Sequence, residues 1–194
     1  MQTTTHTSLL ARLAEEQDDG AWADFCTRYG DLIRGFARRQ GLQPVDCDDV
    51  LQNVLVKLTR SMPAFRYDPS KGKFRSYLKT VVLRCIFDIS FQNRGERPVE
   101  DIEQQVRAAS RDETVESAWE IEWRRHHLRQ AMTVIETEFN TRDVAAFRSY
   151  AINGEDVHTA AATLSMSDDQ VYKAKSRILK RICELVDQQV REEG

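Results

Sequence analysis

Apolar residues recur at helical spacing through most of the chain, and long strand-like alternations are absent. The clearest case lies between Ser165 and Val186, where one apolar stripe contains Val171, Ala174, Ile178, Ile182 and Leu185. Ser167 and Gln170 stand three residues apart at the start of this run, which predicts a capping box. The opposite face is polar and basic, since no acidic residue lies between Gln170 and Cys183. The pattern therefore predicts one amphipathic helix with a basic outer face.

A shorter apolar-faced segment precedes this helix, with Val157, Ala160, Ala161 and Leu164 on one side. A short helix, a tight turn and a longer basic helix follow the plan of a helix-turn-helix, whose second helix enters the major groove of DNA. An ordinary solvated basic face explains this stretch equally well when it is considered alone. The rest of the chain has to distinguish the two interpretations.

The same periodicity predicts a short helix over 8–16, a longer one from about Trp22 to Arg39, a third that begins with Asp46 as its N-cap, and a fourth over about 75–93. Their predicted core positions are Trp22, Phe25, Tyr29, Leu32, Ile33, Phe36, Val50, Leu51, Val54, Leu55, Leu58, Tyr77, Leu78, Val81, Val82, Cys85, Ile86 and Ile89. Glycine (8) and proline (4) are scarce for 194 residues. An all-α fold follows.

Composition changes abruptly after residue 97, where acidic residues dominate and apolar residues become sparse. This change predicts a flexible acidic linker over 98–117 between two small helical domains, 1–97 and 118–194. The first helix of the second domain is predicted from Trp119, Trp123, Leu128, Ala131, Met132, Ile135 and Phe139. A further helix over 141–152 ends before Gly154, and the helix-turn-helix completes the domain.

The formal net charge is −3, so bulk charge gives no support for DNA binding. Charge is instead segregated along the chain, because Asp88 and Glu96 are the only acids between Lys71 and Arg97. Just before and within this basic segment, Phe65 and Tyr67 are interleaved with Arg66, Lys71, Lys73 and Arg75. Rings that stack on unpaired bases and cations that hold phosphates are what single-stranded nucleic acid binding requires.

Other classes of function find little support in the residues. The four cysteines are scattered without a CxxC motif, which favours packed thiols over a disulfide or zinc site. We find no P-loop and no nucleophile motif, so neither an enzyme nor a cofactor is predicted. No apolar run approaches the roughly 20 residues of a membrane span. The N-terminus lacks the features of a secretory signal, and a cytoplasmic protein without membrane insertion is therefore expected.

Three segments, in order, resemble the extracytoplasmic-function (ECF) group of bacterial sigma-70 family sigma factors. They are DCDDVLQNVLVKL at 46–58, YDPSKGKFRSYLKTVVLRCIFD at 67–88 and LSMSDDQVYKAKSRILKRICEL at 164–185. The resemblance implies a subunit without an active site of its own, which binds core RNA polymerase and directs promoter recognition, promoter melting and transcription initiation. It assigns the minus-10 element to domain 1–97 and the minus-35 element to domain 118–194. An anti-sigma factor or another regulator is a further partner that it implies.

The resemblance also implies roles for individual residues. The contact with core polymerase falls on Asp46, Asp48, Asp49 and Gln52. The minus-10 DNA contacts fall on Arg66, Lys71, Lys73, Arg75, Lys79, Arg84 and Arg94. The minus-35 contacts fall on Gln170, Tyr172, Lys173, Ser176 and Arg177. Arg84, Phe91 and Ser165 depart from the family pattern, and the position of Ser165 commonly favours a positive φ.

Two other functions remain open. A stand-alone helix-turn-helix regulator would bind its operator without polymerase, typically as a dimer on paired half-sites. A helical signalling or adaptor protein would not bind nucleic acid at all. The segregated basic charge argues against the adaptor, and the acidic helix at Asp46 argues against the stand-alone regulator.

Overall fold

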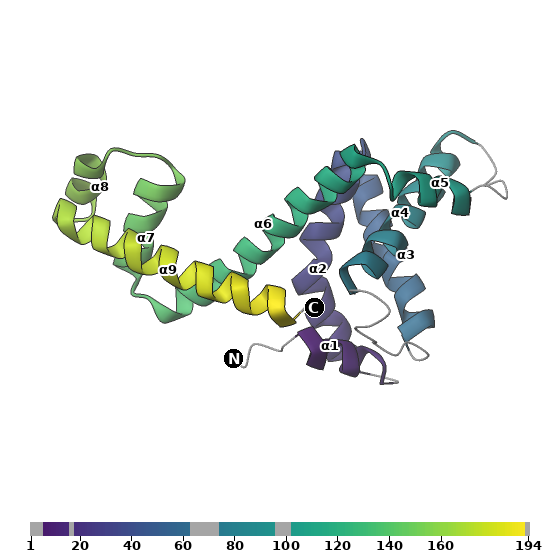
Figure 1. The fold of residues 1–194 in the computed structure, drawn as a ribbon, viewed down its shortest axis with the longest axis horizontal. Coiled ribbons are helices and arrows are strands. Elements are labelled where there is room, and N and C mark those ends of the chain that lie inside the picture. Colours follow the sequence, from purple (N-terminus) through teal and green to yellow (C-terminus); the bar gives the residue numbers. More distant parts are fainter. Residues whose placement is uncertain (1–5, 16–17, 63–73, 96–101, 193–194) are drawn as a thin grey trace. The chain divides into compact units, whose positions relative to one another are not determined.

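The computed structural model describes residues 6–15, 18–62, 74–95 and 102–192, and every regular element within these ranges is helical. The predicted all-α class is therefore confirmed. Contacts between Cα atoms divide the chain into a first unit, residues 1–126 with 192–194, and a second unit, residues 127–191. Figure 1 follows the order of the helices along the chain. Each unit has its own packed side chains and is described by itself.

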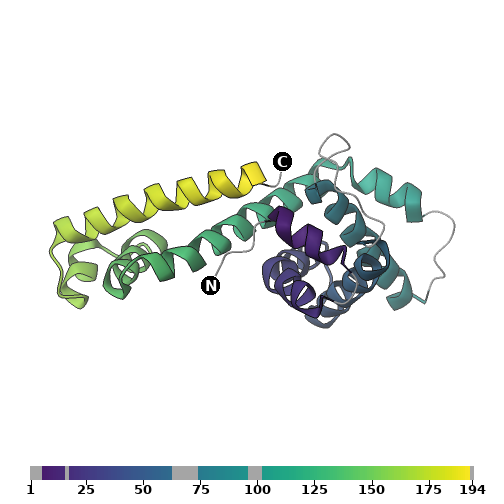
Figure 2. The same cartoon turned by 90° about the horizontal axis from the view of Figure 1, so that it is seen from below.

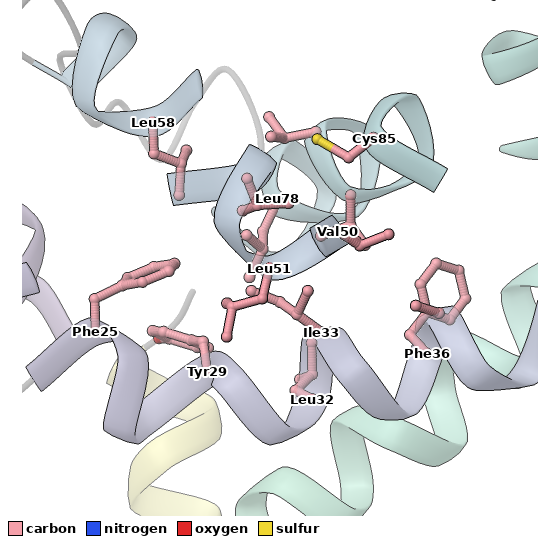
Figure 3. Close-up of a cluster of buried hydrophobic side chains, with 14 of the residues drawn as sticks. Phe25, Tyr29, Leu32, Ile33, Phe36, Val50, Leu51, Leu58, Leu78 and Cys85 are labelled. Carbon is pink, nitrogen blue, oxygen red and sulfur yellow. The ribbon is translucent and has the colours of Figure 1, made fainter. Parts of the chain in front are cut away.

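Helices α1 (His6–Leu13), α2 (Asp19–Arg39), α3 (Pro44–Ser61) and α4 (Phe74–Asn93) build most of the first unit. The apolar stripe of α2 provides three large buried rings, Phe25, Tyr29 and Phe36, and the buried side chains of α3 and α4 pack over it (Figure 3). Of the predicted core positions, Trp22, Leu55 and Tyr77 are half-buried at the margin, and all the others are buried. Helical periodicity was thus sufficient to find most of the core positions that α2, α3 and α4 contribute.

The start of α3 differs from the sequence prediction. Its N-cap is Gln43, with Pro44 in the first helical position, so Asp46 is not the cap. Proline suits this position because its fixed φ is helical and its missing N–H would have had no partner there. Asp46 lies in the first turn of α3 and its carboxylate accepts a hydrogen bond from Asn93 Nδ2 at 3.1 Å.

Much of the predicted flexible linker is helical in the structure. Within 98–117, α5 (Ile102–Ala109) and the start of α6 (Glu113–Glu138) are regular helices, and α6 continues across the division between the units. Val106, Trp119 and Trp123 are buried in the core of the first unit. Trp119 meets Phe36 edge to face, with ring centroids 4.9 Å apart. The sequence placed Trp119 and Trp123 in the second domain, but their large rings bury enough area to hold the start of α6 on the first unit.

A buried carboxylate also fixes α6 against α2. Glu122 is 3% exposed, and it accepts hydrogen bonds from Arg39 Nε at 2.7 Å and from Arg125 at 3.0 Å. Gly35 on α2 leaves the space that this carboxylate fills, since a Cβ atom added there would lie 2.8 Å from Cδ of Glu122. Any larger residue at position 35 would therefore have to displace this buried carboxylate, which favours glycine there.

The second unit consists of the rest of α6, α7 (Thr141–Phe147), the π-helical turn η3 (Arg148–Ile152), α8 (Val157–Thr163) and α9 (Asp168–Glu192). The C-terminal part of α6 and α9 lie side by side (Figure 2), joined by Ala131, Ile135, Ile178, Ile182 and Leu185. Val157, Ala161, Val171 and Ala174 pack α8 on α9. The predicted helices are confirmed here, but Trp119 and Trp123 belong to the first unit and Leu128 is exposed.

Replacing Gly35 with alanine tests the contact between α2 and α6. The added methyl group would overlap the buried carboxylate of Glu122, so Gly35→Ala should lower the free energy of unfolding by about 1–3 kcal/mol in urea titrations. In a Glu122→Ala background the overlap disappears, and the same substitution should stabilise the helix slightly. An equal loss in both backgrounds would contradict the contact.

Candidate nucleic-acid interface

The residues predicted to contact core polymerase gather at the start of α3. Asp48, Asp49 and Gln52 are exposed, whereas Asp46 is half-buried. Asp48 accepts a hydrogen bond from Arg34 Nε at 2.6 Å, and Asp49 makes no ion pair among the described residues. Asp49 and Gln52 therefore present an acidic, polar surface to solvent, while the other two carboxylates are also engaged within the unit.

The residues predicted to contact minus-10 DNA are only partly described. Arg66, Lys71 and Lys73 lie outside the described residues. Arg75, Lys79 and Arg84 project from α4, and Arg94 follows its end with its guanidinium 4.9 Å from the ring centroid of Phe91. The structure thus brings Arg75 and Lys79, one helical turn apart, to one side of α4.

These α4 cations face carboxylates of α5 and α6. Arg75 is paired with Glu120 and Lys79 with Glu116, and Arg84 donates to Glu103 at 2.8 Å. The hydrogen bond from Arg75 lowers the pKa of Glu120 below its ordinary value. The acidic segment that the sequence identified as a linker therefore lies on the basic helix that precedes it.

The turn between α8 and α9 has the geometry that the sequence predicted. Ser167 N–H donates to Gln170 Oε1 at 2.8 Å and Gln170 N–H donates to Ser167 Oγ at 3.3 Å, which is a reciprocal capping box. Ser165 has a φ of 52°, the one non-glycine residue with a positive φ in the described part of the chain. Arg142 Nε donates to the carbonyl oxygen of Leu164 at 2.8 Å, so α7 supports the turn.

The five residues predicted to contact minus-35 DNA are all exposed on α9. Gln170, Lys173, Ser176 and Arg177 line a groove of about 720 Å³ together with Asn140, Arg142, Asp143 and Met166. Tyr172 lies outside this lining and packs edge to face on Tyr150, with centroids 5.5 Å apart. Lys173 pairs with Asp169 at 2.7 Å, where both side chains are about 70% exposed. Cationic and amide side chains in one groove are suited to phosphates and base edges.

Sequence reasoning missed the partner of Arg177. The carboxylate of Asp143, on α7, accepts hydrogen bonds from Arg177 at 2.6 Å and from Asn140 Nδ2 at 2.9 Å. Asp143 is buried while Arg177 is exposed, so the acid restricts the guanidinium to one edge of the groove. The two residues lie 34 positions apart, and no local pattern signals the pairing.

The described residues show no metal site, disulfide or membrane-spanning helix. No cluster of three or more His, Cys, Asp or Glu side chains there is placed to hold a metal ion. All four cysteines are free, Cys47 and Cys85 are buried, and burial raises the pKa of the Cys85 thiol to about 11. None of the described helices is long and apolar enough to cross a lipid bilayer.

Part of the first unit is similar to a known protein family. The model of sigma-70 region 2 matches residues 25–95, which run from α2 to the end of α4. Residues 25–95 are therefore similar to region 2 of the sigma-70 family. The match includes two of the three sequence segments, 46–58 and 67–88, and it supports the family predicted from them.

Similarity to solved structures is weaker. A structure described as CnrH in complex with the cytosolic domain of CnrY shares 23% identity with this chain, covering 93% of this chain and 96% of that one. Its TM-score of 0.37 is too low to support conclusions about the present chain. No curated protein matches the chain in sequence.

Substitution of Ser165 tests the turn before α9. A left-handed conformation costs a non-glycine residue about 1 kcal/mol, so Ser165→Gly should raise the urea midpoint, measured by circular dichroism. Ser176→Gly is the matched control, because Ser176 lies in the interior of α9 and glycine should lower the midpoint there. A decrease of similar size in both variants would contradict strain at Ser165.

Proposed function

We propose that the chain is a sigma factor of the ECF group, which binds core RNA polymerase and directs it to promoters for melting and initiation. The observation that carries this proposal is the match of residues 25–95 to sigma-70 region 2. The presence of a second helical unit with an exposed basic helix after a short turn supports it. The proposal gives the two units different tasks.

The polymerase contact is assigned to the start of α3. Asp46, Asp48, Asp49 and Gln52 would lie against a basic surface of polymerase, and the exposure of the last three supports this role. Arg34 would have to share Asp48 with the partner. Complementary charge of this kind steers association and sets orientation more than it adds affinity.

Promoter contact is assigned to both units. In the first unit, Arg66, Lys71, Lys73, Arg75, Lys79, Arg84 and Arg94 would hold the melted minus-10 strand. In the second unit, α9 would read the minus-35 element through Gln170, Tyr172, Lys173, Ser176 and Arg177. A net charge of −3 makes tight binding of DNA by the free chain unfavourable, so polymerase would supply much of the affinity for the promoter.

The competing proposal is a helix-turn-helix regulator that acts without polymerase. The groove beside α9 is compatible with it, because the same side chains would contact an operator. A specific footprint produced by the free chain would favour this regulator.

An anti-sigma factor or another regulatory protein is a further partner that we propose for the sigma factor.

Reconstituted transcription tests the sigma proposal. Core polymerase with the purified chain should start at discrete promoters, mapped by sequencing of the transcripts, and core polymerase alone should not. Lys173→Ala should reduce initiation by about 10-fold at promoters with a minus-35 element, the loss of one phosphate or base contact. It should leave core binding unchanged, because within the described residues Lys173 pairs with Asp169, which is itself exposed on α9. Absence of initiation by the wild-type chain would refute the proposal.

Asp49→Asn should give the opposite phenotype. Removing this exposed charge should weaken binding to core polymerase by about 3- to 10-fold in a pull-down titration, since it deletes one carboxylate from the contact. Asp19→Asn is the matched control, because Asp19 is an exposed acid in the first turn of another helix. Equal binding by both variants would remove Asp49 from the contact.

A further inference from the structure

Two cations of α4 face two carboxylates of α6 that have the same four-residue spacing. Arg75 and Lys79 stand four residues apart on α4, and Glu116 and Glu120 stand four residues apart on α6. Arg75 pairs with Glu120 and Lys79 with Glu116, so the two helices pair in opposite directions. A third contact joins Arg75 to Glu116 at 3.9 Å. One turn of α4 is thus paired with one turn of α6, and each cation has a carboxylate partner.

The same contacts cover the cations from solvent. The side chain of Lys79 is 12% exposed and that of Arg75 is 25% exposed. The guanidinium of Arg75 also lies 5.2 Å from the ring centroid of Trp123, which is buried on α6. A phosphate approaching α4 would find both cations occupied by carboxylates and the side chains around them.

We propose that Arg75 and Lys79 form a binding surface for a DNA strand, and that the acidic start of α6 occupies this surface until the strand displaces it. The DNA role of the two cations rests on the proposed function, and the competition with α6 is the addition. Carboxylates at helical spacing present negative charge to the cations as a phosphate backbone does. The free chain is therefore closed toward DNA at this surface, and a polyanion shifts the population to an open state.

The start of α6 is held by more than charge. Trp119 is 1% exposed and Trp123 is 4% exposed, so opening transfers two indole rings toward water. The apparent affinity for DNA is reduced by the fraction of molecules that are closed. Weakening the ionic contacts shifts this fraction without touching either cation, which makes the carboxylates the informative positions to change.

The test measures binding of a fluorescein-labelled, mixed-sequence single-stranded DNA to the full chain by anisotropy, at one fixed salt concentration. Glu116→Gln removes the partner of Lys79 and should tighten binding by roughly two- to fivefold, as expected from a partly exposed ion pair. Glu113→Gln is the matched control, since it removes the same charge from the same helical turn and Glu113 makes no ion pair within the described residues. It should change the affinity much less.

Tryptophan fluorescence provides a second readout. Two of the three tryptophans lie on the docked part of α6, so added DNA should shift the emission to the red as they become hydrated. Equal affinities of the Glu116→Gln and Glu113→Gln variants, or weaker binding by Glu116→Gln, would overturn the competition. The sigma proposal would survive that result, because its test is initiation by the wild-type chain with core polymerase. If the wild-type chain fails to initiate but Glu116→Gln binds DNA more tightly, the sigma proposal fails and the competition between α6 and DNA stands.

Discussion

The docking of the first half of α6 on α2 is the constraint on which the first unit depends. Trp119 and Trp123 bury their rings beside Phe36 and Tyr29, and Glu122 places a carboxylate where α2 has Gly35. Burial of a carboxylate is costly unless it is paired, and Arg39 and Arg125 provide the pairing. Because of this contact, the first half of α6 belongs to the first unit, which ends at residue 126. The contact also holds Glu116 and Glu120 against α4.

The consequence for function lies in how charge is distributed. A chain with net charge −3 binds DNA only where cations are concentrated and acids are kept away. Along the sequence the cations of α4 meet that condition, but in the folded first unit three of them face carboxylates of α5 and α6. At the second surface, the buried carboxylate of Asp143 on α7 engages Arg177 of α9, whereas Lys173 of α9 stays exposed. The two proposed DNA surfaces therefore differ in accessibility.

The sequence predicted the features that depend on residues close together in the chain, and it failed for those that depend on residues far apart. Helices and core positions were predicted because an apolar stripe of period 3.6 is a local property, and the capping box of Ser167 and Gln170 is equally local. The N-cap of α3 was predicted wrongly at Asp46 because Pro44 sets the helix start. The linker was predicted as flexible because its apolar residues are few. The indole rings of Trp119 and Trp123, just beyond that stretch, dock α6 on the first unit and hold its start in place.

The sequence by itself determined the helical class, the order of the helices, the turn before α9 and the sigma-70 resemblance. Only the tertiary structure decided which charges meet. Arg75 pairs with Glu120, which is 45 residues away in the sequence, and Arg177 pairs with Asp143, which is 34 residues away. Helical periodicity specifies which side of a helix is apolar, but it carries no information about the partner of a charged side chain. That partner is chosen by how whole helices pack, and packing is a property of the assembled core.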